Sequence, residues 1–174
     1  MGYQQLFLVL ASVVLLTLLM VQINSNTVEG REALQQLEFE HTAVGIAQQF
    51  IEEAKSKNFD GLVGVIPPAS MPAGFTPAVN LGPGTDTYPQ YDDVDDYNDF
   101  SRTVYINGNN FDPDAIDGIP FTVGIKVHYV TDAKPDSAVL TPTFLKRLTV
   151  KVASTWIPDS VVVKHVFSYY GVNL

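Results

Sequence analysis

The pattern of apolar and polar residues divides the first third of the chain into two parts. The stretch from Leu6 to Ile23 is apolar except for three polar residues. The residues that follow, to about Lys57, are mostly polar, contain no proline, and carry apolar residues at three- and four-residue steps. That spacing is typical of one face of an α-helix. We therefore predict one long helix from Met1 to roughly Lys57, apolar in its first half and amphipathic in its second.

The amphipathic half carries two rows of apolar residues. The first row runs from Leu34 to Ala54 and includes His41, and the second consists of Phe39, Ala43, Ile46 and Phe50. At about 100° per residue, the rows are predicted to lie on nearly opposite sides of the helix. An exterior helix of a monomer needs only one buried face, so two rows suggest two partners: the chain's own head and other copies of the helix. A helix enclosed within one domain is the alternative. The residues expected to pack the helix against the head are Leu34, Leu37, Val44, Ala47 and Ile51.

The apolar half has about the length needed to cross a membrane, since a hydrocarbon core of about 30 Å requires roughly 20 residues of helix. A permanent anchor and a cleaved secretory signal are alternative interpretations. A signal has basic residues before its apolar run and a small-x-small cleavage site after it. Here no Lys or Arg precedes Arg31, and Asn-Ser-Asn at residues 24–26 is a poor cleavage site. N-myristoylation is excluded because Leu6 stands where its motif needs Ser or Thr.

The region from Gly61 to Gln90 is rich in proline and glycine. Such a density excludes a helix or a central strand, so we predict a long loop or a linker. Loops of this length are usually functional or disordered. Apolar residues within the region predict that it lies on the rest of the protein: Val63, Val65, Ile66, Phe75, Val79 and Leu81.

The remainder of the chain predicts four β-strands, at residues 101–107, 121–130, 144–156 and 161–170. Alternation of apolar and polar residues over such lengths is typical of strands with one buried face. Residues 133–137, which include Pro135, are predicted to form a turn. Short connections favour an antiparallel meander whose apolar face is covered by the amphipathic helix, giving an α+β fold. The predicted inward residues are Phe121, Val123, Ile125, Val127, Tyr129, Leu148, Val150, Val152, Val161, Val163, Phe167 and Tyr169.

An acidic segment, Tyr91 to Phe100 (YDDVDDYNDF), precedes the first strand. Close carboxylates repel one another unless they are solvated, protonated or neutralised by a cation. Calcium binds about six to eight oxygens, often from clustered Asp residues, so a calcium site is one interpretation and a solvated turn or cap is the other. A second acidic stretch at residues 112–117 would contribute ligands or form a turn. Catalytic carboxylates are disfavoured because no complementary acid, base or nucleophile accompanies them. The candidate calcium ligands are Asp92, Asp93, Asp95 and Asp96.

Composition excludes several function classes. The net charge of −9 and the isoelectric point near 4.5 argue against a nucleic-acid-binding surface, which would be basic. The chain has no cysteine, so disulfides and thiol chemistry are excluded. His41, His128 and His165 show no metal-ligand spacing, and His41 is expected to be a packed or interface residue. Phosphate-binding, dinucleotide-binding and nucleophile-elbow motifs are absent. We therefore expect no enzymatic activity and no cofactor apart from the candidate calcium ion.

In layout the chain resembles the type IV pilins and pseudopilins. The resemblance covers the apolar residues 1–25, the amphipathic continuation, the loop, the segment DDVDDYNDF and the strands that follow it. It implies that a prepilin peptidase removes a short basic leader and often methylates the new N-terminus. It also implies that the inner-membrane pilus assembly machinery moves the apolar helices from lipid into the core of an extracellular filament. The residues implied in assembly are Met1, Gln5, Leu6, Phe7, Leu8, Val9, Leu10, Val13, Val14, Leu15, Leu16, Leu18, Leu19 and Val21.

The chain also departs from the pilin pattern. The family usually has Glu at mature position five, where this chain has Gln5, or Phe7 if cleavage follows Gly2. Gln5 offers only neutral hydrogen bonds to a neighbouring α-amino group. Gln22 stands where many bacterial pilins have a helix-kinking proline, and the cysteine pair of many major pilins is absent.

The expected organisation has four parts. Residues 1–25 form the apolar helix, 26–58 its amphipathic continuation, 59–100 the loop with the acidic segment, and 101–174 the sheet head. We expect a structural subunit of a filament at the cell surface, held in the inner membrane before assembly. Two alternatives stay open: a minor pseudopilin of a secretion or DNA-uptake system, and a membrane-anchored adhesin or binding module that depends on calcium.

Overall fold

A computed structural model describes residues 2–62, 72–107, 110–112 and 117–170. Residues 110–112 are described by their backbone alone. The predicted contacts of Val63, Val65 and Ile66 lie outside the described residues, as do Met1 and most of the second acidic stretch. The chain divides into two units, Met1–Phe39 and Glu40–Leu174.

The predicted long helix is confirmed as α1, Tyr3–Lys55, with 53 residues. Two polar residues in its apolar half satisfy their hydroxyl groups within the helix. Ser12 donates to the carbonyl oxygen of Val9, and Thr17 to that of Val13, each at 2.8 Å. Such bonds let Ser and Thr lie on an apolar helix without an unpaired polar group.

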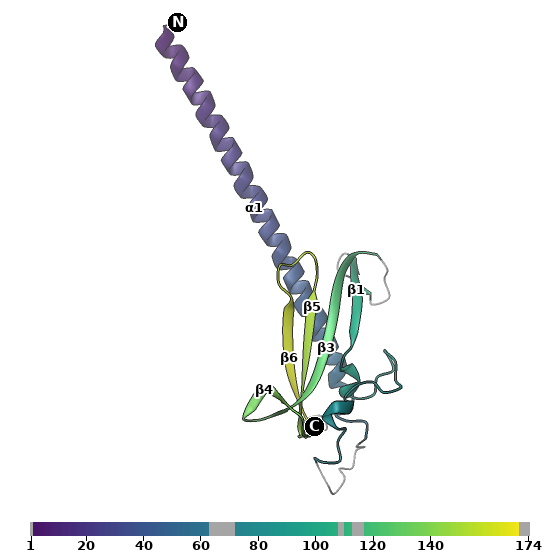
Figure 1. The fold of residues 1–174 in the computed structure, drawn as a ribbon. Coiled ribbons are helices and arrows are strands. Elements are labelled where there is room, and N and C mark those ends of the chain that lie inside the picture. The colour runs from purple at the N-terminus through teal and green to yellow at the C-terminus, as the bar shows by residue number, and fades with distance from the viewer. Residues whose placement is uncertain (1, 63–71, 108–109, 113–116, 171–174) are drawn as a thin grey trace. The chain divides into compact units, whose positions relative to one another are not determined.

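The sheet is antiparallel, with strand order β2-β1-β3-β5-β6, and β4 pairs with β3 (Figure 1). The four predicted strands are confirmed as consecutive neighbours in a meander. The short edge strands β2 and β4 were not expected, and the predicted turn at residues 133–137 is confirmed only at Ala133, because β4 begins at Lys134. Pro135 fits because β4 pairs with β3 alone, and proline is tolerated at a sheet edge. The strands are β1 Ser101–Asn107, β2 Asn110–Asp112, β3 Ile119–Thr131, β4 Lys134–Val139, β5 Leu145–Ala153 and β6 Val161–Ser168.

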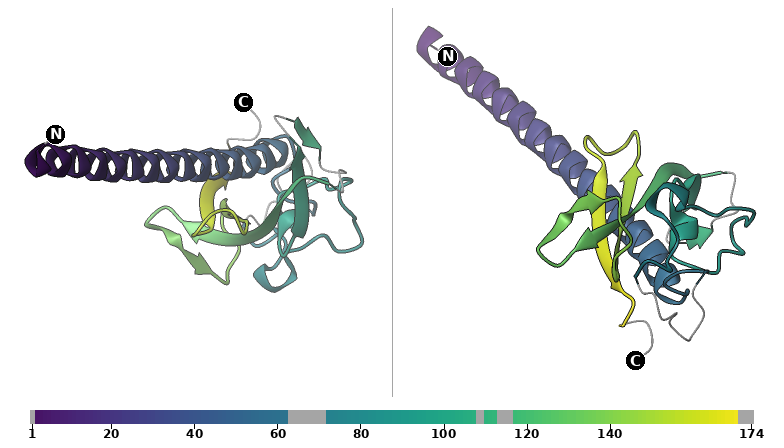
Figure 2. Two further views of the ribbon diagram at one scale, coloured as in Figure 1. Left: turned by 90° about the horizontal axis from the view of Figure 1, so that it is seen from above. Right: turned by 60° about the horizontal axis from the view of Figure 1, so that its bottom comes forward.

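The α+β fold is confirmed: the part of α1 that follows Glu40 packs along one face of the sheet (Figures 1 and 2). The inward residues of β3 and β5 are buried as predicted, and so are Phe167 and Tyr169. Val161 and Val163 in β6 are only half-buried, because β6 is an edge strand. The helix contributes one buried face, made of Ala43, Ile46, Ala47, Phe50, Ile51 and Ala54.

That single face corrects the prediction of two opposite rows. The buried face combines residues of both rows, but Leu34 and Leu37, at the start of the first row, do not belong to it. Leu34 is 68% exposed and Leu37 is 53% exposed, so their predicted packing against the head is wrong. The physical reason is that the buried face begins only after Leu37: every side chain of α1 from Ser12 to Glu38 is exposed, on whichever side of the helix it lies. Val44 is half-buried at the border of the face.

The loop before the sheet lies on the core where the structure describes it. Phe75 and Leu81 are buried as predicted, but Val79 is 83% exposed, contrary to the prediction. Val79 lies in the single-turn 3-10 helix η1, Ala78–Asn80, which has no buried residue. The loop and acidic segment are tied to α1 by Glu53, which accepts hydrogen bonds from the hydroxyls of Tyr97 at 2.7 Å and Tyr88 at 3.1 Å.

Candidate functional site

The apolar half of α1 is the largest exposed apolar surface that the structure describes. All fourteen large apolar side chains from Leu6 to Ile23 are exposed, between 52% for Val14 and 72% for Phe7. Gln5 is exposed as well. By length and composition this helix could cross a membrane, although a signal sequence meets the same criteria. An apolar surface of this extent marks a site of contact with protein or lipid.

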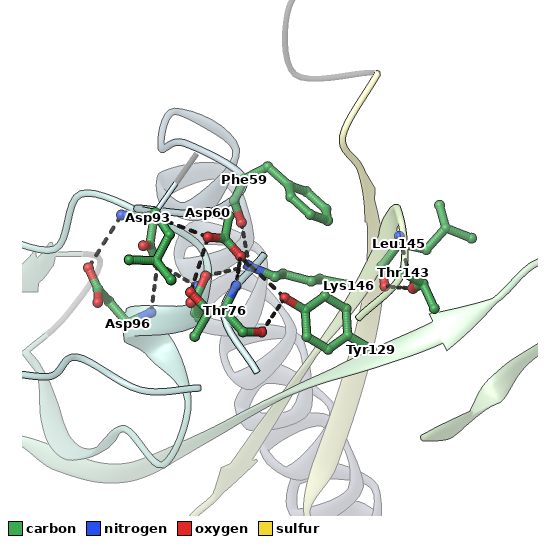
Figure 3. Close-up of polar contacts among 11 residues, drawn as sticks. Phe59, Asp60, Thr76, Asp93, Asp96, Tyr129, Thr143, Leu145 and Lys146 are labelled. Atoms are coloured by element: carbon green, nitrogen blue, oxygen red, sulfur yellow. Dashed lines mark hydrogen bonds and ion pairs between the residues drawn. The ribbon is translucent and has the colours of Figure 1, made fainter. Parts of the chain in front are cut away.

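A second candidate site is a buried group of charged side chains in the head, at the end of β5. Lys146 lies on the inward face of β5 with Leu148, Val150 and Val152, and its side chain has no exposed surface. Its amino nitrogen donates to the carbonyl oxygen of Phe59 at 2.7 Å and to Asp60 Oδ2 at 2.9 Å (Figure 3). It also donates to Asp95 Oδ1 at 2.5 Å. The three acceptors match the three donors of an ammonium group.

Asp60, which follows α1, is the most fully hydrogen-bonded member of this group. Besides Lys146, it accepts from the backbone N–H of Leu62 at 3.1 Å and of Thr76 at 2.9 Å. The hydroxyls of Thr76 and Tyr129 also donate to it, at 3.1 and 3.2 Å (Figure 3). These bonds leave neither carboxylate oxygen of Asp60 without a hydrogen-bond donor. Asp60 thereby connects the end of α1, the long loop and strand β3.

The acidic segment supplies the remaining charged side chains of this group, Asp93 and Asp95. Asp93 Oδ1 accepts from the backbone N–H groups of Asp95 at 2.8 Å and Asp96 at 3.1 Å, and so caps the 3-10 helix η2, Asp95–Tyr97. Burial, the charge of the nearby Asp95 carboxyl and the hydrogen bond that the two side chains share together raise the pKa of Asp93 to about 8. Asp93 is therefore largely protonated at neutral pH. Lys146, Asp60, Asp93 and Asp95 are called the buried charge cluster below.

The structure does not bring the four predicted calcium ligands together. Asp95 points to Lys146, and Asp93 caps η2. The carboxylate oxygens that do converge, within 4.8 Å of one another, belong to Asp86, Asp92 and Asp96. Asp86 and Asp92 are exposed, and exposed acidic groups often lie close together without an ion. The predicted cap is present, but it is buried and not solvated.

Sequence reasoning missed Lys146 and Asp60. The sequence did contain evidence for Lys146. It lies at two-residue steps from Leu148, Val150 and Val152, so its side chain is expected on the same inward face of the strand. Asp60 carries no comparable periodic signal. The prediction that His41 is packed finds no support within one chain, because His41 is exposed.

Comparisons with known proteins complete the description of these sites. A scan against protein-family models, a search of curated proteins and a search of solved structures found no match for this chain.

Proposed function

We propose that the chain is a structural subunit of an extracellular, type IV pilus-like filament, and that it polymerises through the apolar half of α1. One observation carries this proposal: a continuous exposed apolar surface from Leu6 to Ile23 belongs to the same helix that packs against the folded head. A helix that served only the head would not need this surface. A prepilin peptidase and an inner-membrane assembly machinery are the partners that the resemblance implies before assembly.

The proposed mechanism is transfer of the apolar helix from lipid to a bundle of identical helices. Lipid tails are as apolar as leucine, so the hydrophobic effect does not favour the bundle over the membrane, and van der Waals packing must do so. The chain suits such a transfer because it carries no charged residue before Glu29. The internal bonds of Ser12 and Thr17 also leave no hydroxyl that would be unpaired in the bundle.

A minor pseudopilin is a second candidate, favoured by Gln5. A neutral side chain at this position does not form the ion pair with a neighbouring α-amino group that is inferred for major pilins. A subunit at a filament tip does not require that pair. Abundance distinguishes the two candidates, because a major subunit dominates the protein sheared from the cell surface and a minor subunit does not.

The proposal is tested by shearing cells that make the full chain, identifying the released protein by mass spectrometry and imaging it by electron microscopy. We expect Leu15→Asn to abolish filaments while the subunit still accumulates in the membrane fraction, because an amide in the bundle loses packing. Leu140→Asn is the matched control, since Leu140 is 83% exposed on the head and lies outside the apolar helix. Normal filaments from Leu15→Asn, or no filaments from the unaltered chain, would overturn the proposal.

A further inference from the structure

The buried charge cluster combines one amine with three carboxyl groups, of which Asp93 and Asp95 share a hydrogen bond, among buried residues. We propose that Lys146 and Asp95 react there to form an intramolecular isopeptide bond between Lys146 Nζ and Asp95 Cγ. This inference does not depend on the proposed filament function. It concerns the head alone and assigns a covalent modification site.

The contact between the reacting groups is direct and enclosed. Lys146 Nζ lies 2.5 Å from Asp95 Oδ1, and the two side chains are 0% and 4% exposed. The amino nitrogen lies 4.6 Å from the centre of the Phe59 ring and 5.3 Å from that of Tyr129. Aromatic rings beside the amine lower the local dielectric and exclude the water that would compete for the carboxyl carbon. Holding two reactants in contact also removes most of the entropic cost of bringing them together.

Asp95, and not Asp60, is the carboxyl group that reacts. Asp60 accepts four hydrogen bonds from groups other than Lys146, which hold both of its oxygens in place and leave it as the group that receives and returns the proton of the amine. Asp95 shares a hydrogen bond with the side chain of Asp93. A proton delivered along that bond converts the Asp95 carboxylate into a carboxylic acid, which an amine can attack.

The reaction balances without an external reagent. Lys146 first transfers one proton to the Asp60 carboxylate, and Asp93 transfers one to an oxygen of Asp95. The neutral amine then attacks Asp95 Cγ and forms a tetrahedral intermediate. Its nitrogen returns a proton to Asp93, Asp60 protonates the departing hydroxyl, and the carbon–oxygen bond breaks. The products are one amide and one water molecule, Asp60 and Asp93 recover their starting states, and no group is oxidised or reduced.

The bond would link two parts of the head that are distant in sequence. Asp95 lies in η2, and Lys146 lies 51 residues later in β5. A cross-link over such a span removes conformational freedom from the unfolded chain, as a disulfide does. The chain has no cysteine and no disulfide. The amide would therefore link the acidic segment covalently to strand β5 of the sheet.

The test is peptide-level and intact mass spectrometry of the purified full chain in detergent. We expect a mass lower than that of the unlinked chain by one water molecule, and a branched peptide that joins Lys146 to Asp95. Lys146→Arg should retain the water. Lys151→Arg, an exposed position on the same strand, is the matched control and should lose it like the unaltered chain. In the Asp95→Asn variant, formation of the bond should release ammonia in place of water.

Asp93→Asn tests the role of the second carboxyl group. The amide oxygen of Asn can still accept from the N–H groups of Asp95 and Asp96, so η2 keeps its cap while the proton donor is lost. We expect this variant to fold, as judged by circular dichroism, and to remain unlinked. An unaltered chain with its full mass, or a water loss that maps to any pair other than Lys146 and Asp95, would overturn the proposal whether or not the variants fold.

Discussion

Replacing Lys146 with methionine should destabilise the head strongly, because it removes the only cation that Asp60 and Asp95 contact among the described residues. The side chains of Asp60 and Asp95 are 0% and 4% exposed, so water cannot replace the lost ammonium group. Methionine fills a similar volume, so the change removes the charge with little loss of packing.

The magnitude follows from the cost of breaking a buried ion pair by removing one partner, which is about 3–5 kcal/mol. Domains of ordinary stability unfold with about 5–15 kcal/mol, so this loss is a large fraction of the total. This magnitude applies to the ionic form of the cluster; in a chain that carries the proposed amide, the substitution removes the cross-link in place of the Lys146–Asp95 ion pair. We therefore expect the free energy of unfolding of the head to fall by at least about 3 kcal/mol.

The assay is guanidinium unfolding of the full chain in detergent, followed by near-ultraviolet circular dichroism of the aromatic residues in the head. Lys151→Met is the control, because Lys151 is exposed on the same strand, and it should change stability by less than about 0.5 kcal/mol. Adding Asp95→Leu to Lys146→Met should recover part of the loss, since it removes one of the two unpaired carboxylates. A loss below about 1 kcal/mol in Lys146→Met, or one equal to that of the control, would refute the reasoning that the ammonium group holds the cluster together.

Two further predictions concern single positions in the head. Gly61→Ala should lower its stability by about 1–3 kcal/mol, because a Cβ at this position would collide with Asp93 Oδ2. Gly45→Ala on α1 is the control and should stabilise the protein by up to about 1 kcal/mol, since nothing lies within 4 Å of its Cβ; equal effects from both changes would contradict the collision. Burial lowers the pKa of His128, so the unfolded chain binds the proton more readily and the head should lose stability as pH falls from 7 to 5. An NMR titration midpoint for His128 at or above the ordinary value of 6.5 would be inconsistent with that expectation.

The sequence predicted the elements with strong periodicity. The amphipathic half of α1 and strands β3, β5 and β6 have runs of period 3.6 or 2, which indicate the side that is buried, whereas the first half of α1 was predicted from its continuous apolar run and β1 from its residue types. Strands β2 and β4 are short edge strands, and their pairing depends on a neighbouring strand more than on their own residues. Pro135 was interpreted as a turn residue for that reason.

The candidate sites were harder to predict because they depend on contacts between distant residues. The charges of Asp93 and Asp95 indicated a nearby cation. The cation that contacts Asp95 is Lys146, and its place in the alternating pattern of β5 was the only evidence for it in the sequence. Asp60 is identified only by folding, which brings it beside Thr76 and Tyr129. The packing error at Leu34 has a similar origin, since the apolar spacing along α1 starts before the part of the helix that the head buries, and only the fold shows where that part begins.

The central claim is that the apolar half of α1 packs against the same helix of other copies. A helical reconstruction by electron cryomicroscopy of sheared filaments, at a resolution that shows side chains, tests it most directly. We expect Leu6–Ile23 of each subunit to lie in the filament core, in contact with helices of neighbouring subunits. Filaments built from the heads alone, or a protein whose apolar helices contact only lipid, would contradict the claim.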